Sequence, residues 1–221
     1  MSNPIAQTSI LVVEGTDEEN FFSAYVKHLG LDERALLIIK SEGKDNLYKA
    51  FNELMATSAF DGVKRIGIIQ DADRSSIDRF RSIYNFVKKQ VHPFTKQSLT
   101  PPEASGEISH GMPAIGIFLL PDCKSNGMLE TVCLNIVNNS PIMECVEGYI
   151  KCLETRLPDK QDFPKNIEKS KVQAYLAGKP DDVHSIGIAA QKGYWDFAHK
   201  SLEPLKDFLI RLFGQSNNKH N

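Results

Sequence analysis

Short, almost wholly apolar segments alternate along the first half of the chain with segments in which apolar residues recur every three or four positions. The apolar segments are 9–13, 35–40, 65–70 and 114–122, and the periodic segments are 17–30, 43–57, 76–91 and 127–139. The first pattern is typical of strands buried on both faces, and the second of the helices that cover them. The alternation predicts an α/β fold with a mostly parallel, Rossmann-like sheet and helices on both faces.

The pattern changes after residue 137, where the apolar runs end and only helical periodicity remains. Segments 141–157, 170–178 and 202–214 are the predicted helices. We therefore expect an α/β domain over 1–137, an all-helical extension packed on it over 138–214, and a disordered tail over 215–221. The polar segment 95–113, rich in Pro, Ser and Gly, is expected to form a long loop before the fourth strand.

Composition and charge exclude several classes of protein. The 221 residues are 41% hydrophobic and 24% charged, an ordinary composition for a soluble globular protein. The net charge of −2 gives no overall attraction to nucleic acid or to a membrane, so a nucleic-acid contact must use a local patch or a metal. The chain has neither an apolar run near the ~18 residues of a membrane span nor a signal-peptide pattern, so we expect a cytoplasmic protein.

Four cysteines, Cys123, Cys133, Cys145 and Cys152, show no spacing typical of a zinc site. Cys145 and Cys152 lie seven residues apart on a predicted helix. This spacing places them on one helix face, and we expect both to be small buried residues. All four are expected to be reduced thiols.

Acidic residues follow three of the four predicted strands. Glu14 ends the first strand, Asp71 and Asp73 follow the third, and Asp122 follows the fourth. The carboxyl ends of parallel strands meet at one edge of the sheet, where ligands of such folds bind. Glu18 lies four residues after Glu14, and a strand-to-helix turn can bring it to the same point. Carboxylates that converge without basic partners repel one another, and a divalent cation with oxygen ligands, Mg²⁺ or Mn²⁺, relieves that repulsion.

Helix capping is the alternative explanation for these acids. For Asp17 and Glu19 capping is the favoured interpretation, and for Glu18 both interpretations stay open. Asp73 could cap the helix predicted from residue 76. Asp71 directly follows an apolar strand and has no such structural task.

The segment "VVEGTDEENFF", together with a later strand that ends in "DAD", resembles the Toprim domain shared by topoisomerases, bacterial primases and OLD-type nucleases. The resemblance covers residues 9 to 137. It is closest to the OLD-type branch, in which a second acid, here Glu18, follows the glutamate by four residues. "LLPDCKSNGMLETV", "KSKVQAYLAG" and "IGIAAQKGYWDF" resemble a small stand-alone family of Toprim-like bacterial proteins without assigned function, with Asp122 and Glu130 as matching acids.

This resemblance implies a magnesium-dependent hydrolysis of phosphodiesters in nucleic acid. Glu14, Asp71 and Asp73 would hold one metal ion, and Glu18 with Asp122 or Glu130 would serve a second. The alternative role of Glu14 is that of a general acid or base, as is proposed for the glutamate of Toprim domains. Glu130 has the alternative of being an exposed helix residue.

Basic residues would stabilise charge on a reacting phosphate. The resemblance to OLD-type nucleases implies a lysine beyond the acids, and Lys171 is favoured over Lys169 for this role. Arg74, with the basic residues of the helix that follows it, would provide a track for phosphates. For all of these residues a solvated helix surface is the alternative. Trp195 is expected to pack in the core rather than to stack on a base.

The chain departs from the larger Toprim proteins because it lacks the fused ATPase domain of OLD-type proteins, so a separate ATPase partner in defence or repair is expected by analogy. A complete primase or topoisomerase is not expected. Two other functions stay open. "IGIIQDADR" resembles the start of haloacid-dehalogenase-type phosphatases, with Asp71 as nucleophile, although this leaves Glu14 unexplained. The second open function is that of a non-catalytic Toprim-like protein that binds metal or docks a partner.

Overall fold

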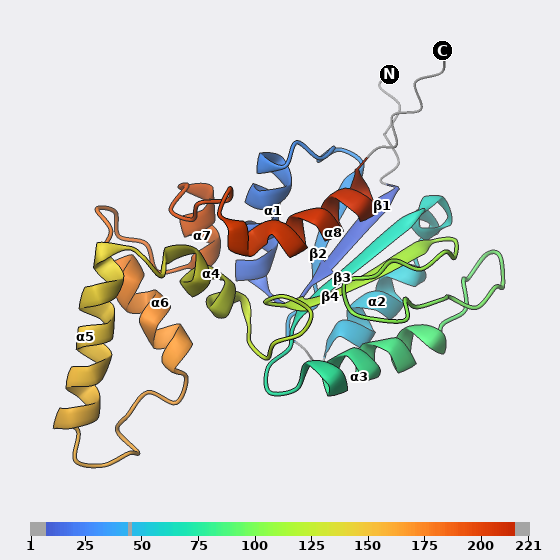
Figure 1. The fold of residues 1–221 in the computed structure, drawn as a ribbon. Coiled ribbons are helices and arrows are strands. Elements are labelled where there is room, and N and C mark those ends of the chain that lie inside the picture. Colours follow the sequence, from blue (N-terminus) through green and yellow to red (C-terminus); the bar gives the residue numbers. More distant parts are fainter. Residues whose placement is uncertain (1–7, 44–45, 215–221) are drawn as a thin grey trace.

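The computed structural model describes residues 8–43 and 46–214. Its centre is a four-stranded, all-parallel sheet with strand order β2-β1-β3-β4 (Figure 1). The strands are β1 (Ser9–Val13), β2 (Leu36–Lys40), β3 (Arg65–Asp71) and β4 (Ala114–Leu120). The predicted α/β fold class is confirmed, since each apolar run of the sequence forms a strand. The tail expected over 215–221 lies outside the described residues.

Helices cover both faces of the sheet, as the alternating pattern predicts. The face with α2 (Leu47–Met55) and α3 (Ser76–Lys88) buries one apolar cluster, which includes Ile68, Ile83 and Val87. The opposite face carries α1 (Thr16–His28), α4 (Leu129–Val137) and α8 (Glu203–Phe213) over a second, larger cluster. Short 3-10 helices at Ser58–Gly62 and Lys200–Leu202 complete the connections. The sheet is therefore buried on both sides, which explains why its strands are almost wholly apolar.

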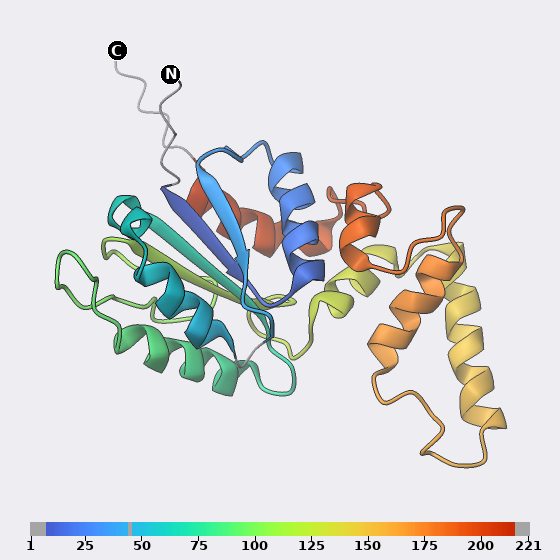
Figure 2. The same cartoon turned by 180° about the vertical axis from the view of Figure 1, so that it is seen from behind.

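The helical extension has two parts that differ in their relation to the sheet. Helices α5 (Pro141–Arg156) and α6 (Ile167–Ala177) pair with each other and stand beside the α/β body as an arm (Figures 1 and 2). Helix α7 (Ile186–Gln191) returns to the body and packs on α1, while α8 crosses β3 and β4. The apolar cluster on this face contains residues from both sides of position 137, so the core is continuous across it.

Glycines allow the close approach of the C-terminal helices. Gly67 and Gly116 are paired across β3 and β4, and a Cβ at Gly116 would lie 2.8 Å from the ring of Phe208 on α8. At Gly187 on α7 a Cβ would lie 2.4 Å from the Cβ of Asn20 on α1. The absence of side chains at these positions lets helices pack directly on the strands and on α1.

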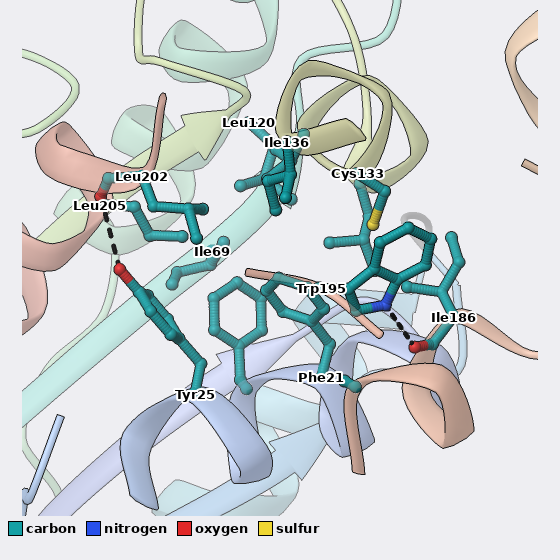
Figure 3. Close-up of a cluster of buried hydrophobic side chains, with 14 of the residues drawn as sticks. Phe21, Tyr25, Ile69, Leu120, Cys133, Ile136, Ile186, Trp195, Leu202 and Leu205 are labelled. Atoms are coloured by element: carbon teal, nitrogen blue, oxygen red, sulfur yellow. Dashed lines mark hydrogen bonds between the residues drawn. The ribbon is translucent and has the colours of Figure 1, made fainter. Parts of the chain in front are cut away.

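Trp195 lies in the core, as predicted from the sequence. It is 2% exposed, its Nε1 donates to the carbonyl of Ile186 at 3.0 Å, and its ring stacks on Tyr175 with 5.6 Å between centroids. Figure 3 shows it beside Phe21 and Cys133, at the junction of α1, α4 and α7. The indole fixes the C-terminal helices to the body and is not available to stack on a base.

The segment 95–113 forms a long loop that covers the outer edge of β4. The backbone N–H groups of Gly106 and Ser109 donate to the carbonyls of Ile117 and Ile115 at 2.7 and 2.8 Å. The hydroxyl of Ser109 also accepts a hydrogen bond from the Ile115 N–H, and that of Ser105 accepts one from the Leu119 N–H. An exposed strand edge can pair with other chains, and this loop satisfies the edge groups within the molecule.

The expectation that Cys145 and Cys152 are buried is wrong. Both are exposed, because α5 turns Met143, Val146 and Ile150 toward its neighbours instead. Cys133 is buried and Cys123 is half-buried, and all four are free thiols. In the part of the chain that the structure describes, no helix has the length and apolar character that a membrane crossing requires.

Candidate functional site

Parallel pairing of β1 and β3 brings their acidic ends to the same edge of the sheet. Val12 is the register partner of Ile68, so Glu14 and Asp71 leave adjacent strands at nearly the same height. The backbone carbonyl of Glu14 accepts hydrogen bonds from the Gly43 N–H at 2.9 Å and the Ser41 hydroxyl at 3.3 Å. The loop after β2 therefore fixes the end of β1.

Gly15 forms the turn that folds Glu18 back toward the strand ends. Helix α1 begins at Thr16, directly after this glycine. A Cβ at Gly15 would lie 3.0 Å from Oε2 of Glu18, closer than nearly all real contacts of a Cβ. The glycine thus leaves room for the end of the Glu18 side chain beside the turn.

The raised pKa values of Asp71 and Glu18 show which acidic side chains lie close enough to affect one another. The pKa of the Asp71 carboxyl is raised to about 8. Burial is the largest cause, and the nearby acids Glu14, Glu18, Glu130 and Asp73 contribute in that order. Burial also raises the pKa of Glu18, with Glu14, Glu130 and Asp17 adding to the shift against an opposing backbone hydrogen bond. We call the five residues Glu14, Glu18, Asp71, Asp73 and Glu130 the acid cluster.

Two loops of the carboxyl edge are joined at the acid cluster. The backbone of Asp73, with φ +52°, pairs with that of Gly127 through hydrogen bonds of 2.9 and 3.1 Å. Oδ1 of Asp71 accepts from the N–H of Leu129, the first residue of α4, at 3.0 Å. Asp73 does not cap the following helix, because Ser75 is the N-cap of α3 and accepts from the Asp78 N–H. This outcome rules out the capping alternative for Asp73.

Asp17 has a structural task, although not as a cap of its own helix. Its Oδ1 accepts hydrogen bonds from the Ser185 hydroxyl and from the Gly187 N–H, the latter at 3.1 Å. These bonds tie α1 to the start of α7. Asp17 is thereby engaged outside the acid cluster, whereas Glu18 belongs to it.

Among the residues that the structure describes, two cations flank the acid cluster from different elements. Nη2 of Arg79, on α3, lies 3.9 Å from Oε2 of Glu14, and Nζ of Lys169, on α6, lies 3.7 Å from Oε1 of Glu130. The Arg79 side chain is 15% exposed and that of Lys169 is 62% exposed. The arm therefore reaches the carboxyl edge through its helix α6, which also accepts a 2.6 Å hydrogen bond at Glu168 from the Thr131 hydroxyl of α4.

Two of the predicted site residues, Asp122 and Lys171, are engaged elsewhere. Asp122 accepts hydrogen bonds from the N–H groups of Lys124 and Ser125 and from the Ser125 hydroxyl. Burial raises its pKa, but these hydrogen bonds outweigh burial and leave the pKa lowered. Nζ of Lys171 donates to Oε1 of Glu147 on α5 at 2.6 Å. Lys169, two residues earlier, is the lysine that approaches the acid cluster.

An open groove of about 640 Å³ runs beside the acid cluster, between the start of α3 and the arm. Its lining includes Asp73, Arg74, Ser75, Arg79, Met128 and Asn166. Asn126 fixes the backbone before α3, since its amide donates to the Arg74 carbonyl at 2.8 Å and accepts from the Ser76 N–H at 3.1 Å. The groove offers two guanidinium groups next to the carboxylates.

The acid cluster fits a hard divalent cation in donor type and charge. All its donors are carboxylate oxygens, which suit Mg²⁺ and Mn²⁺, and their mutual repulsion is what such a cation relieves. Within residues 8–43 and 46–214, no three His, Cys, Asp or Glu side chains already converge as a metal-binding group. Binding a metal would therefore require these side chains to move closer together.

From the sequence, Arg79 is expected only as one of several basic residues in a track for phosphates, and no role is expected for Asn126 or Gln70. Arg79 shares a helix face with Ile83 and Val87, the buried residues of α3, because they follow it by four and eight positions. That spacing is the signal that separates Arg79 from the exposed Arg81 on the same helix. Asn126 and Gln70 carry no comparable signal, since their positions follow from loop conformation and strand register.

The fold and this edge define a class of protein: a parallel α/β domain with half-buried carboxylates at the carboxyl ends of its strands and a helical arm beside them. A family model, described as a protein of unknown function (DUF3226), matches residues 8–214. The chain belongs to this family. No curated protein and no solved structure matches the chain.

Proposed function

We propose that this protein is a divalent-metal-dependent phosphodiester hydrolase that acts on nucleic acid. The observation that supports the proposal is the environment of Asp71, a buried carboxyl whose pKa is raised to about 8 by burial and by four further acids. Such a concentration of buried negative charge costs stability without a ligand, and perturbed carboxyls of this kind are typical of functional sites.

In this proposal Glu14, Asp71 and Asp73 hold one divalent cation, and Glu18 with Glu130 serves a second. A bound metal ion lowers the pKa of its water and stabilises negative charge on phosphate oxygens. Asp122 is left out of the ligand set because its carboxylate already accepts three hydrogen bonds from its own turn.

The remaining residues of the edge bind and orient the substrate. Arg74 and Arg79 line the groove next to the acid cluster, and Lys169 lies against Glu130 at its other side. A phosphodiester in the groove would meet positive groups from the body and from the arm. This local charge takes the place of the overall basic charge that the chain lacks.

The test is a calorimetric titration of Mg²⁺ and Mn²⁺ into the wild type and the Asp71→Asn/Asp73→Asn double variant. Binding is expected in the wild type and lost in the double variant, because two ligands lose their charge. Asp122→Asn is the matched control, an acid at the end of the neighbouring strand, and should bind as the wild type does. Equal binding in the double variant and the wild type would contradict the site.

Cleavage assays on plasmid DNA, single strands and tRNA then test the reaction. Loss of cleavage in the double variant, with retention in Asp122→Asn, is expected. Retention of cleavage in both would contradict the proposed site. A phosphoenzyme that accumulates during turnover would instead indicate the haloacid-dehalogenase-type alternative, with Asp71 as nucleophile.

A second candidate is a non-catalytic protein that binds metal or docks a partner through its helical arm. One observation favours it: the described carboxylates are not drawn together as a ready metal-binding group. Metal binding that depends on Asp71 and Asp73, without cleavage of any of the nucleic acids, is the result expected for this candidate.

A further inference from the structure

Arg79 differs from the neighbouring arginine of α3 in its surroundings. Its side chain is 15% exposed, whereas that of Arg81 is 68% exposed and pairs with Asp78 on the same helix. Arg79 lies on the face of α3 that packs on the sheet. The helix therefore holds this guanidinium beside the strand ends and largely out of water.

Two of the three guanidinium nitrogens of Arg79, Nε and Nη2, make no hydrogen bond within the described part of the chain. Its Nη2 lies 3.9 Å from Oε2 of Glu14, which is an ion pair but is too long for a hydrogen bond. Its Nε and Nη2 are buried and make no hydrogen bond with any residue in 8–43 or 46–214. A guanidinium normally binds carboxylate or phosphate with two parallel hydrogen bonds. Burying a guanidinium away from water without these hydrogen bonds lowers the stability of the fold.

Gln70 shows the same feature on the same side of the sheet. It is 1% exposed, and neither its amide nitrogen nor its amide oxygen has a hydrogen-bond partner among the described residues. Side chains alternate along a strand, so Gln70 faces the α3 side together with Ile68, as does Glu14 together with Val12. Apolar residues would fill this space with less cost, so packing does not explain the choice of polar ones.

Arg79 also lines the groove between the start of α3 and the arm, together with Arg74, Ser75 and Asn166. Its guanidinium therefore has a carboxylate on one side and an open groove on the other. On one side is Glu14 of the acid cluster, and on the other is an open groove with room for a phosphodiester. A planar guanidinium matches the oxygens of either group.

We propose that Arg79 exchanges partners when a divalent cation binds. In the ligand-free protein it is a counter-ion of Glu14, and a cation bound by Glu14 displaces it into the groove, where it binds a phosphate oxygen of the substrate. This inference rests on the proposed function, since it assigns a role to a residue of the same site. It also accounts for an Nη2 that lies near Oε2 of Glu14 without a hydrogen bond to it.

The first test measures metal affinity alone, with Mn²⁺ titrated into metal-free Arg79→Gln by calorimetry. Removing a competing positive charge next to Glu14 should increase Mn²⁺ affinity by about tenfold. Arg79→Lys, which keeps the charge, should bind Mn²⁺ nearly as the wild type does. Arg81→Gln, on the same helix, is the matched control and should not change the affinity.

The second test measures binding of fluorescent single-stranded DNA and RNA oligonucleotides by anisotropy, with Ca²⁺ present. Arg79→Gln should weaken oligonucleotide binding by about tenfold, because the groove loses a charged phosphate ligand. Arg81→Gln should change it by less than about twofold. Tighter metal binding and weaker oligonucleotide binding in one variant is a combination that mere structural damage would not produce.

Each other outcome overturns the inference. Equal Mn²⁺ affinity in Arg79→Gln and wild type would show that Arg79 does not compete with metal, and weaker affinity would show that it only supports the site. Either result leaves the proposed function standing if the Asp71→Asn/Asp73→Asn variant loses metal. No Mn²⁺ binding in any variant would overturn both. Circular dichroism checks the fold, and Arg79→Met, which keeps the aliphatic stem, replaces Arg79→Gln if that variant unfolds.

Discussion

The ends of β3 and β4 are neighbours in the sheet and both are followed by an aspartate, yet the two carboxyls have opposite properties. Burial and the other acids that crowd Asp71 together raise its pKa to about 8. Asp122 lies in a turn whose N–H and hydroxyl groups satisfy it and lower its pKa. An acid at the carboxyl edge of a parallel sheet is therefore not sufficient for a metal site. The hydrogen bonds that the following loop donates to the carboxylate decide whether its negative charge is already compensated.

The largest expected effect is on the stability of the metal-free protein at Asp71. The folded-state pKa of about 8 lies above the unfolded value, so this carboxyl stabilises the fold below about pH 4 and that contribution is lost as the pH rises toward about 8. One pKa unit corresponds to about 1.4 kcal/mol, so several kcal/mol are involved. Urea unfolding in EDTA should show the free energy of unfolding falling between about pH 5 and about pH 8.

Asp71→Asn removes this dependence, because the amide does not ionise while its oxygen can still accept from the Leu129 N–H. The variant should be more stable than the wild type at about pH 8 by roughly 2 kcal/mol or more. A smaller slope should remain from Glu18, whose pKa burial raises in the same direction. If the free energy of unfolding had the same pH dependence in the wild type and in Asp71→Asn, then the pKa of Asp71 would not be raised in the fold.

The comparison of these two aspartates also shows what a sequence can predict. The apolar runs predict the strands, and parallel pairing then places Glu14 and Asp71 at one edge. The lowered pKa of Asp122 depends on how residues 122–125 fold back on themselves, which no periodicity indicates. The pattern of apolar residues sets the strand register, whereas the hydrogen bonds that a polar side chain accepts depend on how the loop folds.

Tertiary packing determines two further features that residue spacing does not encode. Lys169 and Lys171 lie two positions apart on one helix, so they point to different sides, and the contact of α6 with α4 and α5 determines which one faces the acid cluster. Cys145 and Cys152 share a helix face, as their spacing predicts, but that face is the exposed one. Periodicity identifies a face without saying what covers it.

The second expected effect is the stabilisation of the fold by metal. A ligand present at about one hundred times its dissociation constant stabilises the folded state by about 2.7 kcal/mol. Mn²⁺ should therefore raise the free energy of unfolding of the wild type, and most at about pH 8, where the acid cluster is most ionised. Asp71→Asn/Asp73→Asn should gain almost nothing, and Asp122→Asn should gain as much as the wild type. An equal gain in all three proteins would place the metal elsewhere.

The smallest expected effect is that of Asp122→Asn on stability, and it should have the opposite pH dependence. Because the pKa of Asp122 is lowered in the fold, its contribution is present above about pH 4 and lost as the pH falls through the folded-state pKa. The substitution removes the acceptor charge and the bond from the Ser125 hydroxyl, so it should cost about 0.5–1 kcal/mol at neutral pH, since water partly screens this turn. Urea unfolding of the two aspartate variants side by side checks this: Asp71→Asn should gain stability at high pH and Asp122→Asn should lose it. If both variants lost stability at high pH, then both carboxyls would be compensated in the fold, and the acid cluster would have no excess charge for a cation to relieve.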